Sequence, residues 1–142
     1  MTRNAVSRWE HFPHEADMGV RGIAPTKAAA FAQAALALTA IITPPDAIKP
    51  TEQITLSTEA PDDELLLVDF LNALIFEMAT RKMLFSRFEV NIADGRLTAR
   101  VWGEHTDVAR HQPTVEVKGA TYTQLHVGEQ DGLWTAQCIV DV

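Results

Sequence analysis

The hydrophobic period of the sequence changes at Leu84, and this change constrains the fold more than any other feature. Before it, apolar residues recur every three or four positions, as on the buried face of a helix. They are Leu67, Leu71, Leu74, Ile75 and Met78. After it, apolar and polar residues alternate through 88–92, and Asp94-Gly95 is typical of a tight hairpin turn. The sequence therefore predicts a long helix followed by an antiparallel hairpin.

The remaining pattern predicts one more helix and further strands. A helix near 27–42 should begin after Thr26, a good N-cap, and end at Pro44. The long helix should span about 62–82, with Asp62 or a neighbour as its cap. We expect about seven strands among eight candidate segments, which are 9–12, 20–24, 53–57, 88–92, 97–101, 115–117, 121–127 and 133–140. The expected fold class is α+β, a single-domain sandwich with two helices packed on one face of a mostly antiparallel sheet.

Length, charge and cysteine content narrow the class of protein. The 142 residues suit one domain, 1–142. A net charge of -7 is a poor basis for holding nucleic acid directly. Cys138, the only cysteine, lies among apolar neighbours and is expected in the core. The first eight residues are polar and lack a signal-peptide core, and no apolar run is long enough to span a bilayer, so we expect a cytoplasmic protein.

The segment His14-Glu15-Ala16-Asp17-Met18-Gly19 is a candidate cation site. Asp17 directly precedes an apolar strand, and Asp141 closes the last strand just before Val142. A carboxylate at a strand end either bonds local amides, as in a capped turn, or holds a cation. Because a hard cation takes several oxygen ligands, we expect the two ends of the chain to meet and Asp17 to face Asp141. His14 either orients this loop or belongs to the site.

Two further polar segments carry candidate residues. The first contains Glu104, Asp107 and His111, which either add ligands to the cation site or are ordinary polar residues of a solvent-exposed loop. Lys118 lies among apolar and small residues, and is expected at the end of a strand. Its ammonium is either a structural ion-pair partner or a contact for an anionic group such as a phosphate. No GxSxG elbow, P-loop, GxGxxG or HExxH motif is present, so the common hydrolases, nucleotide-binding folds and zinc enzymes are not indicated.

Taken in order, these segments resemble the archease family over nearly the whole chain. The resemblance is carried by the combination of short motifs in a chain of this length, since no single one is specific. The motifs are HEADMG, the helix with Asp69-Phe70-Leu71-Asn72, Gly103-Glu104 with His111, Val117-Lys118 with Thr121-Tyr122, and Asp141-Val142. Two departures are visible: Glu15 stands where the family often has Thr, and Thr123 where it often has His.

The resemblance implies a partner protein of an RtcB-type RNA ligase. Archeases promote guanylylation of the ligase's active-site histidine and support its repeated turnover in tRNA splicing and RNA repair. By motif match, Asp17 and Asp141 with main-chain or terminal oxygen of Val142 would bind a divalent cation, with Ca2+ expected and Mg2+ or Mn2+ as alternatives. Lys118, His14 and Glu104 would form the functional surface. RNA would be met only through the ligase.

Two alternatives to a ligase activator stay open at this stage. One is a small metal-dependent enzyme that uses Asp17, Asp141 and Lys118 itself. An enzyme needs a nucleophile or base with an orienting partner, and the sequence offers no convincing pair. The other is a chaperone-like or metal-binding interaction module without a ligase partner.

Overall fold

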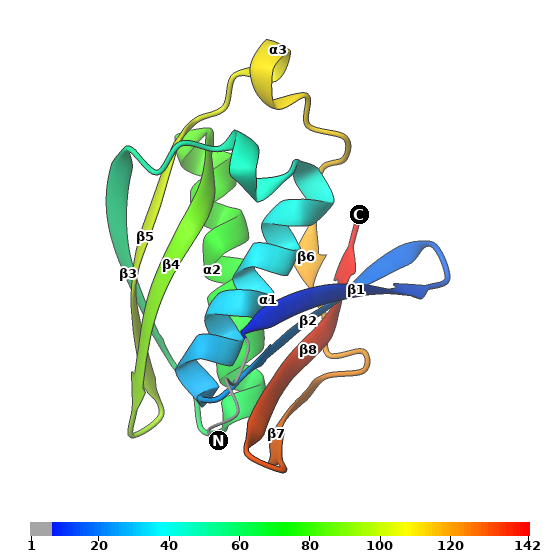
Figure 1. The fold of residues 1–142 in the computed structure, drawn as a ribbon, viewed down its shortest axis with the longest axis vertical. Helices are drawn as coiled ribbons and strands as arrows, with labels where there is room; N and C mark the ends of the chain where they lie inside the picture. Colours follow the sequence, from blue (N-terminus) through cyan, green and yellow to red (C-terminus); the bar gives the residue numbers. More distant parts are fainter. Residues whose placement is uncertain (1–6) are drawn as a thin grey trace, which may run out of the picture.

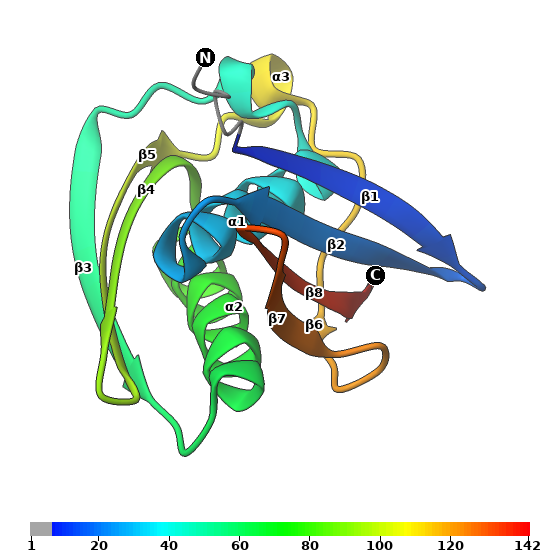
Figure 2. The same ribbon diagram turned by 60° about the horizontal axis from the view of Figure 1, so that its bottom comes forward.

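The computed structural model describes residues 7–142, and the two main helices lie between two antiparallel sheets (Figure 1). The expectations for the extreme N-terminus concern residues 1–6 and lie outside this range. The view in Figure 2 shows the layers, with helices α1 and α2 between a three-stranded and a five-stranded sheet. The α+β class is confirmed, while the single sheet of the prediction is divided into two. None of the helices within residues 7–142 has the length and hydrophobicity needed to cross a bilayer.

Both helices form where the sequence predicts them. Helix α1 spans Lys27–Ile42, and the Thr26 side chain accepts a hydrogen bond from the amide of Ala29. Helix α2 spans Asp63–Arg81, with Asp62 as its N-cap. It ends where Lys82 adopts a left-handed conformation. The short helices η1 (Pro45–Ala47) and α3 (Val108–His111) were not predicted.

The three-stranded sheet has the order β3-β5-β4, with strands β3 (Glu52–Glu59), β4 (Met83–Ala93) and β5 (Arg96–His105). The hairpin between β4 and β5 turns at Asp94 and Gly95, both with positive φ, as the sequence predicts. Near the start of β4 a bulge shifts the register between Phe85 and Arg87.

The five-stranded sheet joins the two ends of the chain. Its path is β1 (Arg8–His14), β2 (Asp17–Ala24), β8 (Leu133–Asp141) and β6 (Gly119–Ala120), and β7 (His126–Gln130) also pairs with β8. The predicted pairing of N- and C-terminal strands is therefore confirmed, in the form of β2 beside β8. The core lies between the sheets, where Phe31 of α1 stacks on Phe70 of α2 at a ring-centroid distance of 6.3 Å.

Two predicted strands are wrong. Residues 115–117 form no strand and do not alternate in burial, since Val115 and Glu116 are exposed and Val117 is buried. The adjoining Thr114 instead donates its amide to the carbonyl of Ile42 at the end of α1. The segment 121–127 is mostly a turn, in which Gln124 is left-handed; only its last two residues enter a strand. Lys118 therefore follows a loop rather than an alternating strand.

Candidate functional site

The candidate site lies at the edge of the five-stranded sheet where β2 begins and β8 ends. Met18 of β2 is directly opposite Val140 of β8, so the same antiparallel register places Asp17 opposite Asp141 one step further on. Directly opposed residues project from the same face of a sheet, with their Cβ atoms about 5 Å apart. The register is compatible with the sequence prediction that these two carboxylates face each other, which stays a prediction.

A pocket of about 240 Å³ adjoins this edge. Its lining includes Asp17 and Val142, with further residues from β1, α1 and the 112–118 loop. Asp17 and Val142 are both half-buried, whereas Asp141 is exposed. The two chain ends therefore bring side-chain and main-chain oxygens to one partly enclosed place.

Lys118 belongs to the same edge through its main chain. Its amide donates to the carbonyl oxygen of Asp141 at 2.9 Å, and the next residue, Gly119, pairs with Asp141 across β6 and β8. The Lys118 side chain is exposed. Within residues 7–142 its ammonium forms no ion pair closer than 4 Å, which does not support the structural ion-pair interpretation.

The oxygen atoms at this edge are of the kind that hard cations prefer as ligands. Within residues 7–142, the carboxylates of Asp17 and Asp141 take part in no ion pair and accept no hydrogen bond, so nothing there supports Asp17 as a turn cap. Two carboxylates close together on one face repel each other, and a nearby positive charge offsets this repulsion. No group of three or more His, Cys, Asp or Glu side chains in the described part of the chain could hold a metal. A cation here would therefore need main-chain, terminal or water oxygens as well.

His14 stands beside the carboxylate pair. It is the cross-strand partner of Asp17 in the β1–β2 hairpin, whose turn is made by Glu15 and Ala16. Its Nδ1 atom is buried and has no hydrogen-bond partner within residues 7–142. The prediction that His14 orients the loop is not supported by any contact of this nitrogen.

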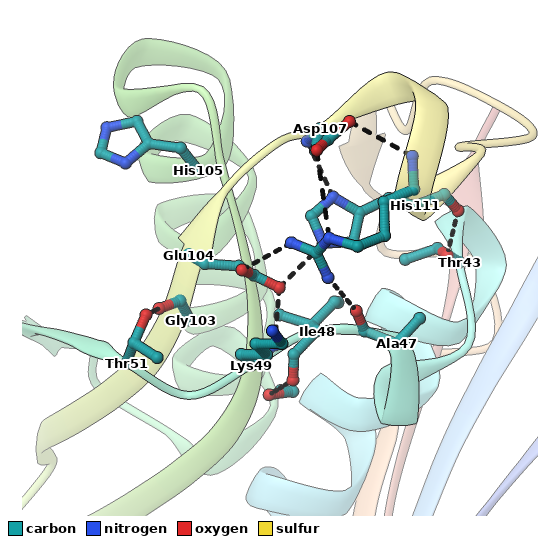
Figure 3. A network of polar contacts seen from close by, with 12 residues as sticks. Thr43, Ala47, Ile48, Lys49, Thr51, Gly103, Glu104, His105, Asp107 and His111 are labelled. Atoms are coloured by element: carbon teal, nitrogen blue, oxygen red, sulfur yellow. Dashed lines mark hydrogen bonds and ion pairs between the residues drawn. The ribbon is translucent and has the colours of Figure 1, made fainter.

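Glu104 lies at the centre of a second polar cluster, which joins β5 to α3 and to the loop after η1 (Figure 3). Its carboxylate accepts bonds from the Arg110 guanidinium at 2.7 Å and from the Lys49 amide at 2.7 Å. His111 Nε2 lies 3.0 Å from it. The bonds from Arg110, with those from Lys49 and His111, lower the pKa of Glu104 to about 2. Glu104 is therefore engaged in local structure, and its role in a functional surface stays a prediction.

His111 is buried, and both of its ring nitrogens have hydrogen-bond partners. It is 2% exposed, and its Nδ1 accepts the amide of Asp107 at 2.8 Å. Because Nδ1 is an acceptor, the proton of the neutral ring lies on Nε2 and is donated to Glu104. Asp107 caps α3 by accepting the Arg110 amide. The interpretation of Glu104, Asp107 and His111 as a merely solvated loop is thus replaced by a bonded cluster.

Comparison with known proteins places the chain in a family. Residues 9–142 match the archease protein family. This chain belongs to the archease family. The archease of Pyrococcus furiosus is 36% identical over 96% of this chain and 100% of its own length. That of Methanopyrus kandleri is 36% identical over 94% of this chain and 99% of its own length. The family resemblance predicted from the sequence is confirmed.

Solved archease structures share the fold. Protein 1598 of Methanobacterium thermoautotrophicum is 26% identical, with a TM-score of 0.78 over 94% of this chain and 98% of its own. A Thermotoga maritima protein described as an archease and possible chaperone has a TM-score of 0.59 at 14% identity, over 100% of this chain and 98% of its own. At that identity the second likeness concerns the fold alone.

Sequence reasoning assigned no role to two residues of these polar regions, Arg110 and Asn72, although Asn72 belongs to the helix motif named above. Arg110, which bonds Glu104, was hidden because its partner lies on another element. Asn72 of α2 bonds both main-chain groups of Ala120 in β6, close to Lys118. Asn72 lies on the same helix face as Val68 and Ile75, four positions before and three after it, and a polar residue between these apolar ones was the available signal.

Proposed function

We propose that this archease is an accessory protein that activates an RtcB-type RNA ligase. It promotes guanylylation of the ligase and repeated turnover in tRNA splicing or RNA repair. It carries out no catalysis of its own and meets RNA only through the ligase. The observation that carries the proposal is the convergence of Asp17, Asp141 and the Lys118 main chain at one sheet edge, in a chain that belongs to the archease family.

Each residue of this edge has a role in the proposal. Asp17, Asp141 and an oxygen of Val142 hold a divalent cation, Ca2+ in the first instance, because oxygen donors favour hard cations over zinc. When bound, the cation supplies positive charge that offsets the two carboxylates. Lys118 extends an exposed ammonium from the same edge toward the ligase. Positive charge placed beside a phosphate favours phosphoryl and nucleotidyl transfer.

The direct test mixes purified archease with an RtcB-type ligase and labelled GTP, and measures the rate of guanylylation. We expect the wild type to raise the rate and Lys118→Ala to abolish most of the increase. Because Lys118 is exposed, its substitution should leave the melting temperature nearly unchanged. Lys49→Ala, which removes a charge from another exposed position, is the matched control. Equal stimulation by Lys118→Ala and wild type would contradict the role of Lys118.

Calorimetry with calcium tests the cation site separately. Asp17→Asn and Asp141→Asn should each weaken binding at least tenfold, since each removes one of few charged ligands. Asp94→Asn, in the hairpin turn of the other sheet, should bind calcium as the wild type does. Calcium should also raise the wild-type melting temperature by mass action. Equal binding by Asp17→Asn and wild type would remove Asp17 from the site.

The alternatives give different results in the same experiments. A chaperone-like module would suppress aggregation of unrelated proteins and leave guanylylation of the ligase unchanged. A small metal-dependent enzyme would turn over a substrate without the ligase. Either outcome, together with absence of stimulation by the wild type, would replace the proposal.

A further inference from the structure

The segment that carries Lys118 has little secondary structure of its own. Strand β6 contains only Gly119 and Ala120, paired with Asp141 and Val140 of β8. The residues before it form no strand, and a turn follows it. Two residues of pairing are too few to order a strand by themselves. Flanking residues add bonds to β8, from the amides of Lys118 and Thr121 to the carbonyls of Asp141 and Ile139. These bonds all lie on the β8 side, so the opposite side of the segment needs a contact of its own.

Asn72 supplies that contact. Its side-chain oxygen accepts the Ala120 amide at 2.9 Å, and its side-chain nitrogen donates to the Ala120 carbonyl at 3.3 Å. A carboxamide carries the same donor and acceptor as a peptide group, so it bonds the amide and carbonyl of Ala120 as a neighbouring strand would. Asn72 itself is fixed, because Leu71 and Leu74 beside it on α2 are fully buried.

The two bonds act on the position of Lys118. Lys118 is two residues before Ala120, and its amide bonds Asp141 at 2.9 Å. Gly119, between them, lies close enough to Asn72 that an added Cβ would stand 3.5 Å from its side-chain oxygen. The segment is thus held between β8 on one side and helix α2 on the other.

We propose that Asn72 is the positioning residue for Lys118. By taking the place of a strand along β6, its carboxamide keeps Lys118 beside Asp141, where its ammonium and the carboxylates form one surface. This inference rests on the proposed function of Lys118. Asn72 acts through the main chain of β6 and touches neither partner nor cation.

Only a carboxamide satisfies both groups of Ala120. Asn72→Asp keeps the size of the side chain, but an ionised carboxylate has no donor and would face the Ala120 carbonyl oxygen. Asn72→Ala removes both bonds and leaves the two main-chain groups to water. Asn91→Asp, at an exposed position of β4, introduces the same charge at a distant strand and serves as the control.

The first measurement is hydrogen exchange at the Lys118 and Ala120 amides, with the melting temperature recorded for every variant. We expect exchange about tenfold faster in Asn72→Asp and Asn72→Ala, the size that follows from losing two neutral hydrogen bonds. Amides of β2 should keep wild-type exchange, which shows that the sheet itself is intact. Asn72→Asp is the informative variant if Asn72→Ala does not fold, because it preserves packing. Unchanged exchange at both amides would overturn the proposal.

The second measurement is stimulation of ligase guanylylation by Asn72→Asp, Lys118→Ala and the double variant. We expect Asn72→Asp to lose most of the stimulation, and the double variant to match Lys118→Ala, because both changes remove the same contribution. Full stimulation by Asn72→Asp, with Lys118→Ala impaired, would overturn the positioning role alone. A double variant well below Lys118→Ala would overturn it too. Full stimulation by Lys118→Ala would instead refute the proposed function on which this inference rests.

Discussion

Replacing Glu104 by Gln should make the protein less stable at neutral pH and should change how its stability depends on pH. The Glu104 carboxylate accepts bonds from Arg110, Lys49 and His111, and its side chain is 13% exposed. These bonds lower its pKa from 4.5 to about 2. The lowered pKa corresponds to at most about 3 kcal/mol, and screening by nearby solvent reduces the expected contribution to on the order of 1–2 kcal/mol.

The sign of the pH dependence follows from the direction of the pKa change. Between about pH 2 and pH 4.5, the Glu104 carboxyl is protonated in the unfolded chain and ionised in the folded chain. The stabilisation is therefore complete above about pH 4.5 and is lost as the pH falls toward 2. A Gln at this position has no such proton. The difference in unfolding free energy between wild type and Glu104→Gln should accordingly shrink as the pH falls through this range.

Urea unfolding at a series of pH values between 7 and 2.5 measures this difference. Glu129→Gln, at an exposed position of β7, is the control and should show a small difference with little pH dependence. A gap between wild type and Glu104→Gln that stays constant from pH 7 to 2.5 would refute the reasoning, because the stabilisation would then not come from the charged carboxylate.

Three further predictions concern the core and the helix cap. Burial raises the pKa of the Cys138 thiol to about 12, so the folded protein should resist alkylation at pH 8 and react only after unfolding; rapid labelling of the native state would contradict this. Gly103→Ala should destabilise by several kcal/mol, since its Cβ would stand 1.8 Å from the Leu84 carbonyl oxygen. Denaturant titration checks it against Gly132→Ala, whose Cβ meets no neighbour and which should lose only about 1 kcal/mol through its positive φ. Asp62→Ala should cost about 1 kcal/mol in the same titration, because the Leu65 amide loses its capping bond; no loss would show that water replaces the cap.

The local elements could be predicted from the sequence because their signals are local. Thr26 and Asp62 mark the starts of α1 and α2, and the observed bounds agree within one residue with those expected. The Asp94-Gly95 turn, and the Asp131-Gly132 turn between β7 and β8, are likewise specified by adjacent residues that tolerate positive φ. Caps and tight turns depend on the residues that form them, so short-range reasoning suffices for them.

The errors come from segments whose hydrogen bonds go to distant partners. Residues 115–117 have the alternation of a strand, but the loop containing them is tied to the end of α1 by Thr114. The cluster around Glu104 depends on Lys49, more than fifty positions earlier in the chain. The division of the strands into two sheets is likewise set by which strands pair, and alternation alone does not specify the partner.

The candidate site depends on the most distant pairing of all, and its register is set by the core. Val20 and Cys138 are opposite each other in β2 and β8, and both are fully buried. Because side chains alternate between faces, a slip of one residue would turn one of these strands outward and bury its polar residues. The same register, continued one residue beyond the pair of Met18 and Val140, places Asp17 opposite Asp141. Burial of the core thus determines which residues meet at this edge, and the edge needs no special sequence beyond the two carboxylates themselves.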